Sequence, residues 1–129
     1  MRTIEITIEQ KILNLATAKT DFTINLNEKD SKNRYIVGCN LLYIGHNPSL
    51  QYDLMSTIKK NISIDLYDSI GGWFDKDTNL YYVDMNFHIQ DITFALKWAA
   101  VNKQLAIYDQ QEKQVLYLSN SGFYNYAKQ

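Results

Sequence analysis

Asp68-Ser-Ile-Gly-Gly-Trp-Phe-Asp-Lys-Asp-Thr-Asn-Leu-Tyr-Tyr-Val-Asp84 is the stretch of sequence that decides the fold. It is typical of two short strands joined by a polar turn at 75–79. After the turn, apolar and largely polar residues alternate as far as residue 89, which predicts an antiparallel strand with one buried face. The inward row is expected to be Tyr81, Val83, Met85, Phe87 and Ile89, and the outward row Tyr82, Asp84, Asn86 and His88.

Outside this hairpin, the spacing of apolar residues predicts three helices, near 8–19, 48–60 and 91–103. Residues 1–6 read as a short strand before the first helix. Residues 22–26 alternate and residues 34–44 are apolar on both faces, which predicts a hairpin whose second strand is central. A last hairpin is expected from 105–109 and 115–118. The chain is therefore expected to form one α+β domain over 1–129, with a single mixed or antiparallel sheet and about three helices packed mainly on one face.

The composition supports an ordinary folded domain. The chain has 129 residues, of which 46% are hydrophobic and 21% charged, and this is enough apolar material to bury a core. It shows no apolar run of roughly 18–20 residues and no signal-peptide pattern, and its single cysteine forms no internal disulfide. We therefore expect a cytoplasmic protein with no membrane association.

Two motifs that resemble ligand sites fail at named positions. Asp75-x-Asp77-x-Asn79 begins like a calcium loop, but Leu80 stands where such a loop needs Gly and Asn86 where it needs Glu. Gly71-Gly72 lacks the surrounding residues of a phosphate-binding loop, so a bulge or a ring packed over the glycines is favoured. No metal and no cofactor are expected.

Catalytic chemistry finds little support in the sequence. Cys39 lies in a doubly apolar strand, where cysteine usually acts as a small hydrophobe. His46 lies in a turn and His88 on the polar row of a strand, and the sequence carries no recognisable catalytic motif around any of the three. We expect a protein that is not an enzyme, and an enzyme that uses Cys39 or a histidine stays a second alternative.

Aromatic residues carry the strongest functional signal. The sequence has ten tyrosines and two tryptophans, more large rings than a small core needs, and such residues are enriched at interfaces. The expected partner-binding residues are those of the outward row and the aromatic tail, together with the tryptophan of the hairpin: Trp73, Tyr82, Asp84, Asn86, His88, Phe123, Tyr124 and Tyr126.

Residues 69–109 resemble a module of small phage and mobile-element accessory proteins. The resemblance rests on Gly71-Gly72-Trp73-x-Asp75, Tyr81-Tyr82-x-Asp84, a helix, and Gln104-x-Ala106-Ile107-x-Asp109. Some proteins of that broad origin inhibit bacterial defence systems, as anti-CRISPR proteins do. The resemblance implies no catalytic residues and leaves residues 1–67 unmatched. It implies an accessory protein that works by binding.

These observations predict a non-enzymatic protein that binds and blocks a larger partner, a protein or ribonucleoprotein such as a CRISPR-type nuclease complex. Burial of aromatic anchors beside aspartates would supply the binding energy, and the acidic second half would compete for a basic nucleic-acid groove. The first alternative is a small nucleic-acid-binding protein, although a net charge of −1 argues against indiscriminate binding. It would use basic residues of the N-terminal half: Lys11, Lys19, Lys29, Lys32, Arg34, Lys59 and Lys60.

Overall fold

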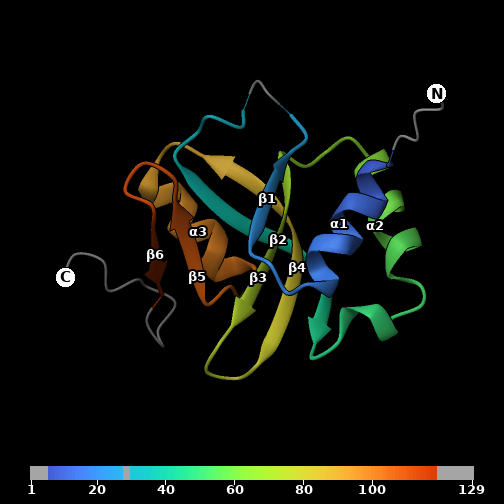
Figure 1. Ribbon diagram of the computed structural model, residues 1–129. Coiled ribbons are helices and arrows are strands. Elements are labelled where there is room, and N and C mark those ends of the chain that lie inside the picture. The colour runs from blue at the N-terminus through green and yellow to red at the C-terminus, as the bar shows by residue number, and fades with distance from the viewer. Residues whose placement is uncertain (1–5, 28–29, 119–129) are drawn as a thin grey trace.

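The chain folds into an antiparallel sheet with three α-helices. The computed structural model describes residues 6–27 and 30–118. The strands are β1 (Phe22–Asn25), β2 (Tyr35–Gly45), β3 (Ser69–Asp75), β4 (Leu80–Ile89), β5 (Ala106–Asp109) and β6 (Gln114–Tyr117), in the spatial order β1-β3-β4-β2-β5-β6 (Figure 1). The helices are α1 (Ile8–Thr17), α2 (Leu54–Ser63) and α3 (Ile92–Val101), with a 3₁₀ turn η1 (Pro48–Leu50). Every strand pairing is antiparallel, so the predicted α+β fold is confirmed.

The hairpin predicted at 68–84 forms two inner strands of the sheet, β3 and β4. β3 pairs with β4 along its whole length, from Ser69 with Asn86 to Asp75 with Leu80. Asp75 closes the turn by accepting hydrogen bonds from the Asp77 amide and the Thr78 hydroxyl, as polar turn residues commonly do. The predicted hairpin and its turn are therefore confirmed.

A glycine in β3 makes room for a buried ring. A Cβ at Gly72 would overlap the Tyr81 hydroxyl and the Phe22 ring, so only glycine fits between them. Tyr81 is fully buried and donates its hydroxyl to the Thr20 carbonyl at 2.6 Å. The expectation of a ring packed over the Gly71-Gly72 pair is confirmed at Gly72.

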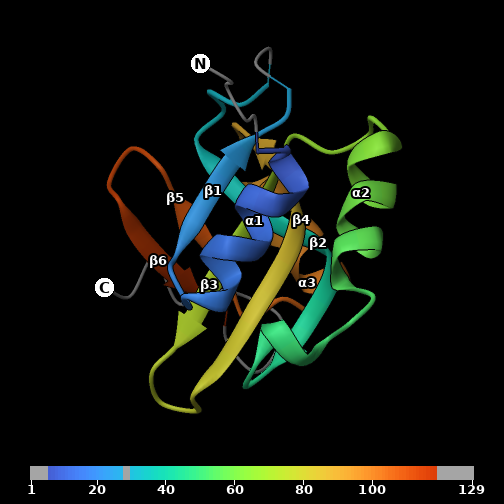
Figure 2. The same ribbon diagram turned by 45° about the vertical axis from the view of Figure 1, so that its right-hand side comes forward.

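The helices pack along one face of the curled sheet, which we call the helix face. α1 and α2 cover one end of it, where Ile12 and Ile58 meet the β3 and β4 side chains of Ile70 and Val83. α3 covers the other end beside β2 and β5, where Ala95 and Ala99 belong to a second cluster with Tyr35, Val37, Ile107 and Leu116. Figure 2 shows α1 in front of β3 and β4, with α2 beside it.

Two predicted details of the fold are wrong. β1 does not form a hairpin with β2 but pairs with β3, as Phe22 with Gly72, while β2 takes the central position that was expected of it, between β4 and β5. The second helix does not begin at Pro48: η1 ends at Leu50, Gln51 is extended, and α2 begins at Leu54 and runs through Ser63. The strand expected at 1–6 falls almost entirely outside the described residues.

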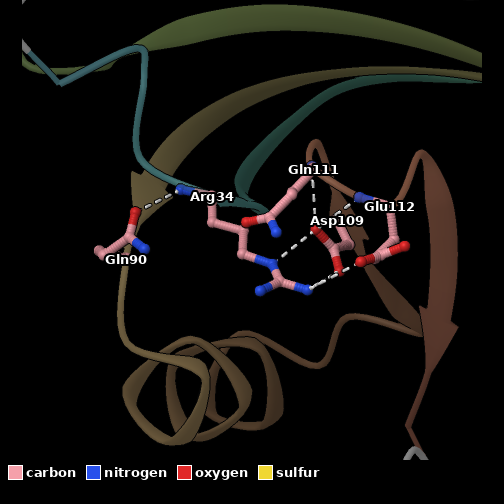
Figure 3. A network of polar contacts seen from close by, with 5 residues as sticks. All are labelled: Arg34, Gln90, Asp109, Gln111 and Glu112. Carbon is pink, nitrogen blue, oxygen red and sulfur yellow. Dashed lines mark hydrogen bonds and ion pairs between the residues drawn. The ribbon is translucent and has the colours of Figure 1, made fainter.

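A partly buried ion pair joins Arg34, which directly precedes β2, to Asp109 at the end of β5. Arg34 donates from Nε and Nη2 to the two carboxylate oxygens of Asp109 at 2.9 and 2.8 Å (Figure 3). Asp109 also accepts hydrogen bonds from the Gln111 and Glu112 amides. The hydrogen bond from Arg34 is the main cause that lowers the pKa of Asp109 below its ordinary value, which keeps this fully buried carboxyl ionised and paired.

Candidate partner-binding face

The side of the sheet opposite the helices, which we call the open face, carries a compact group of side chains on the three central strands. Across the sheet, Trp73 of β3 pairs with Tyr82 of β4, which pairs with Ile44 of β2. In the adjacent row, Gly71 pairs with Asp84, and Asp84 with Leu41. Because directly opposed residues of a sheet project to the same side, these residues share one surface. We call Leu41, Ile44, Trp73, Tyr82 and Asp84 the central patch.

Much of the central patch is accessible. The exposed fractions of Leu41 and Ile44 are 47% and 49%, and Trp73, Tyr82 and Asp84 are partly exposed. The rings of Trp73 and Tyr82 are tilted by 31° with their centroids 5.3 Å apart, a spacing typical of favourable aromatic pairs. Two aliphatic and two aromatic side chains therefore form a contiguous surface on rigid strands.

Asp84 places a carboxyl group within this apolar surface. Burial raises the pKa of Asp84 from its ordinary value of 3.8 to about 7, because a low-dielectric environment disfavours the charged form. Among residues 6–27 and 30–118, no side chain or backbone amide forms a hydrogen bond or ion pair with its carboxylate. Burial, followed by the Asp75 and Asp84 charges, raises the pKa of Tyr82 as well. The patch thus combines apolar contact area with an uncompensated acidic group.

The other end of the outward row is covered, which corrects the expectation that the whole row is displayed. Asn86 and His88 are only 6% and 3% exposed. The loop between β1 and β2 crosses this end of the open face, since His88 Nδ1 lies 2.9 Å from the Ser31 carbonyl and Asn33 donates to the His88 carbonyl. Asn86 and His88 therefore offer no accessible surface to a partner, and the accessible part of the row is Tyr82 and Asp84.

Under this loop lies a buried polar network that sequence reasoning missed. The Ser31 carbonyl can only accept, so Nδ1 of His88 carries a proton, and Nε2 forms a hydrogen bond of 2.7 Å with the Ser69 hydroxyl. Asn86 donates to the same hydroxyl at 3.1 Å, and Asp68 accepts from the His88 amide at 2.8 Å. Ser69 is fully buried. The position of Ser69 opposite Asn86 in the predicted hairpin was the one available signal for this contact.

The other candidate catalytic groups, Cys39 and His46, are not part of the central patch. Cys39 occupies a bulge of β2, packs against the helix-face core and donates its thiol to the Met85 carbonyl at 3.2 Å. Burial, followed by the charges of Asp84 and Asp68, raises the pKa of Cys39 to about 12, which keeps the thiol protonated, whereas the thiolate is the nucleophile. His46 is exposed after β2, with Nδ1 2.9 Å from the Asn79 carbonyl.

The basic residues of the nucleic-acid alternative do not share one described site. Lys32 and Arg34 line a shallow hollow of about 490 Å³ together with Asn25, Gln90 and Gln110, but the Arg34 guanidinium is already paired with Asp109. Lys59 and Lys60 are exposed on α2 and do not line that hollow. Lys29, Phe123, Tyr124 and Tyr126 lie outside the described residues.

No protein-family model matches the chain, and no curated protein or solved structure gives a significant match. In the described part of the chain, none of the helices has the length and apolar character needed to cross a membrane.

Proposed function

We propose that this protein is a non-enzymatic binding protein that docks on a larger partner through the open face of its sheet. The observation that carries the proposal is the central patch, where Leu41, Ile44 and the Trp73–Tyr82 ring pair lie in adjacent rows on the three central strands. Tryptophan and tyrosine contribute most to binding when they are buried at the centre of an interface.

The position of the central patch favours a role in partner binding over a role in packing the core. The core is already filled on the helix face, where two buried clusters include side chains of all three helices. The patch side chains stand on paired strands, so little conformational entropy is lost when a partner covers them. Covering them would remove apolar surface from water at about 25 cal/mol per Å².

For the partner we propose a host defence complex of the CRISPR type. This choice rests on the resemblance of residues 69–109 to small phage and mobile-element accessory proteins, whose matching residues include Trp73, Tyr82 and Asp84 of the patch. Blocking would follow from occupation of a surface that the nuclease complex needs, in competition with its nucleic acid or its other subunits.

The docking surface is tested by affinity capture from the native host with three forms of the protein. Wild type and Tyr52→Asp, whose tyrosine is 96% exposed between η1 and α2, are expected to retain the same partner. Ile44→Asp, which places a charge in the patch, is expected to lose at least 90% of it. Equal retention by Ile44→Asp and Tyr52→Asp would show that the open face is not the docking surface.

The choice of partner is tested by phage plating on bacteria that carry an active CRISPR system against that phage. Expression of the wild type is expected to restore plaque formation, and Ile44→Asp is expected to leave immunity intact at an equal protein level. If the wild type restores plating on none of the CRISPR types tested, the defence-complex proposal fails, while the docking surface is judged by the capture experiment.

A further inference from the structure

We infer that the central patch binds an arginine side chain of the partner, whose guanidinium pairs with Asp84 and lies along the Trp73–Tyr82 rings. The inference rests on the proposed function, because it names the chemistry of the group that the same open face receives. It concerns the two features of the patch that apolar contact alone does not explain: the acidic group at its centre and the paired rings beside it.

Asp84 is partly exposed on the open face. Its cross-strand neighbour on β2 is Leu41, which is half exposed. Its neighbour on β3 is Gly71, where the Asn86 side-chain amide lies 3.0 Å from the place a Cβ would take. The Trp73–Tyr82 pair occupies the next row of the same face, two residues away along β3 and β4. A ligand that contacts Asp84 from the side of this row therefore also meets the two rings.

The described surroundings of Asp84 supply no counter-charge to its carboxylate. Of the described lysines and arginines, none lies within ion-pair distance of Asp84. Burial alone raises the pKa of its carboxyl, so the ionised form lacks the partner that would offset its desolvation.

Arginine fits these features better than a metal or a lysine does. One carboxylate is too few ligands for a metal ion, and the described residues contain no group of three metal-ligating side chains. A guanidinium is planar and weakly hydrated, so it stacks on aromatic rings while it donates two parallel hydrogen bonds to a carboxylate. The ammonium group of lysine offers a point charge without that planar match.

The test uses a matched pair of peptides, Ac-Leu-Arg-Leu-NH2 and the same peptide with citrulline in place of arginine. Citrulline keeps the planar shape and removes the charge. Each is titrated into the full-length ¹⁵N-labelled protein at pH 8, where Asp84 is ionised. The arginine peptide is expected to shift the amide signals of Leu41, Tyr82 and Asp84 and the Trp73 indole signal, and the citrulline peptide is expected to bind at least tenfold more weakly.

Two variants assign the effect to Asp84. Asp84→Asn keeps the shape of the side chain and is expected to abolish the preference for arginine, while Asp77→Asn, in the exposed hairpin turn, is expected to preserve it. Because binding needs ionised Asp84, with its pKa of about 7, the arginine peptide should bind roughly 30-fold more weakly at pH 5.5 than at pH 8. The Asp84→Asn variant should not show this pH dependence.

Each outcome separates this inference from the proposed function. Equal shifts of the patch by both peptides, or an arginine preference that survives in Asp84→Asn, would overturn the inference and leave the open face as a docking surface. No shift at the patch with either peptide at 10-fold molar excess and millimolar concentration would also overturn it. The proposed function is then judged separately by partner capture with Ile44→Asp.

Discussion

At the scale of single residues, Asp84 occupies an environment that disfavours its ionised form. A strand that only supported the core would gain stability from a neutral residue there, because the ionised carboxyl is desolvated without a compensating partner. The unfolded chain ionises near the ordinary pKa of 3.8, whereas the folded protein does so near 7. The resulting penalty is absent below about pH 4, grows as the pH rises, and is complete above about pH 7.

The first prediction follows from this linkage. Asp84→Asn should match the wild type in stability at pH 4 and exceed it at pH 8 by up to about 4 kcal/mol, since each pKa unit corresponds to about 1.4 kcal/mol. Urea unfolding of both proteins at the two pH values measures the difference. A stability difference that does not change between pH 4 and pH 8 would show that Asp84 is not desolvated in the folded state.

The buried Ser69–His88 contact gives a second prediction at the same scale. Ser69→Ala removes the hydrogen-bond partner of His88 Nε2 and the acceptor for Asn86 Nδ2, and we expect it to lower the free energy of unfolding by about 2 kcal/mol. Ser63→Ala, at the exposed end of α2, should change it by less than about 0.5 kcal/mol. Similar effects of both substitutions would mean that the network contributes little to stability.

At the scale of elements, two helices end in the same way without glycine. After α1, the Lys19 and Thr20 amides donate to the Ala16 and Leu15 carbonyls. After α3, the Lys103 and Gln104 amides donate to the Ala100 and Ala99 carbonyls. These are the paired bonds of a Schellman motif, whose αL position is usually glycine. Here it is lysine, at φ 55° after α1 and φ 56° after α3.

The left-handed lysine after α3, Lys103, gives the third prediction. Lys103→Gly should raise the free energy of unfolding by about 0.5–1 kcal/mol, because glycine adopts the left-handed conformation without the steric penalty of a Cβ. Lys97→Gly, in the interior of α3, is the matched comparison and should lower stability by about 1 kcal/mol. Thermal unfolding of the two variants measures both. If Lys103→Gly also destabilises the protein, the left-handed cap is not strained.

Local patterns explain why several elements were predictable. The β3–β4 hairpin and the caps of α1 and α3 depend on residues a few positions apart: the Thr7 and Asp91 side chains each accept from the amide three residues on. The start of α2 was missed because Asn47 and Pro48 give the usual local signal, yet they begin only η1, and the extended Gln51 separates it from α2. No local sequence pattern predicts this break between η1 and α2.

At the scale of the whole molecule, the errors concern contacts between distant segments. β1 pairs with β3, nearly 50 positions away, although β2 is closer along the chain and equally apolar. Likewise, alternation alone placed His88 on an outward row, but the loop that buries it contacts His88 through Ser31, 57 residues earlier. Within the candidate site, alternation correctly placed Tyr82 and Asp84 on the face away from the helices, and Trp73 lies opposite Tyr82 on β3. Alternation did not predict that Leu41 and Ile44 share this face, because bulges in β2 shift their register.

The claim that the protein docks through its open face is tested most directly by site-specific photocrosslinking in the native host. A benzophenone amino acid replaces Ile44 in one form of the protein and Tyr52, in the helix layer, in another. The fourth prediction is that position 44 yields one discrete crosslinked partner and position 52 yields none. A partner crosslinked equally from both positions, or from position 52 alone, would contradict the assignment of the central patch as the surface through which this protein works.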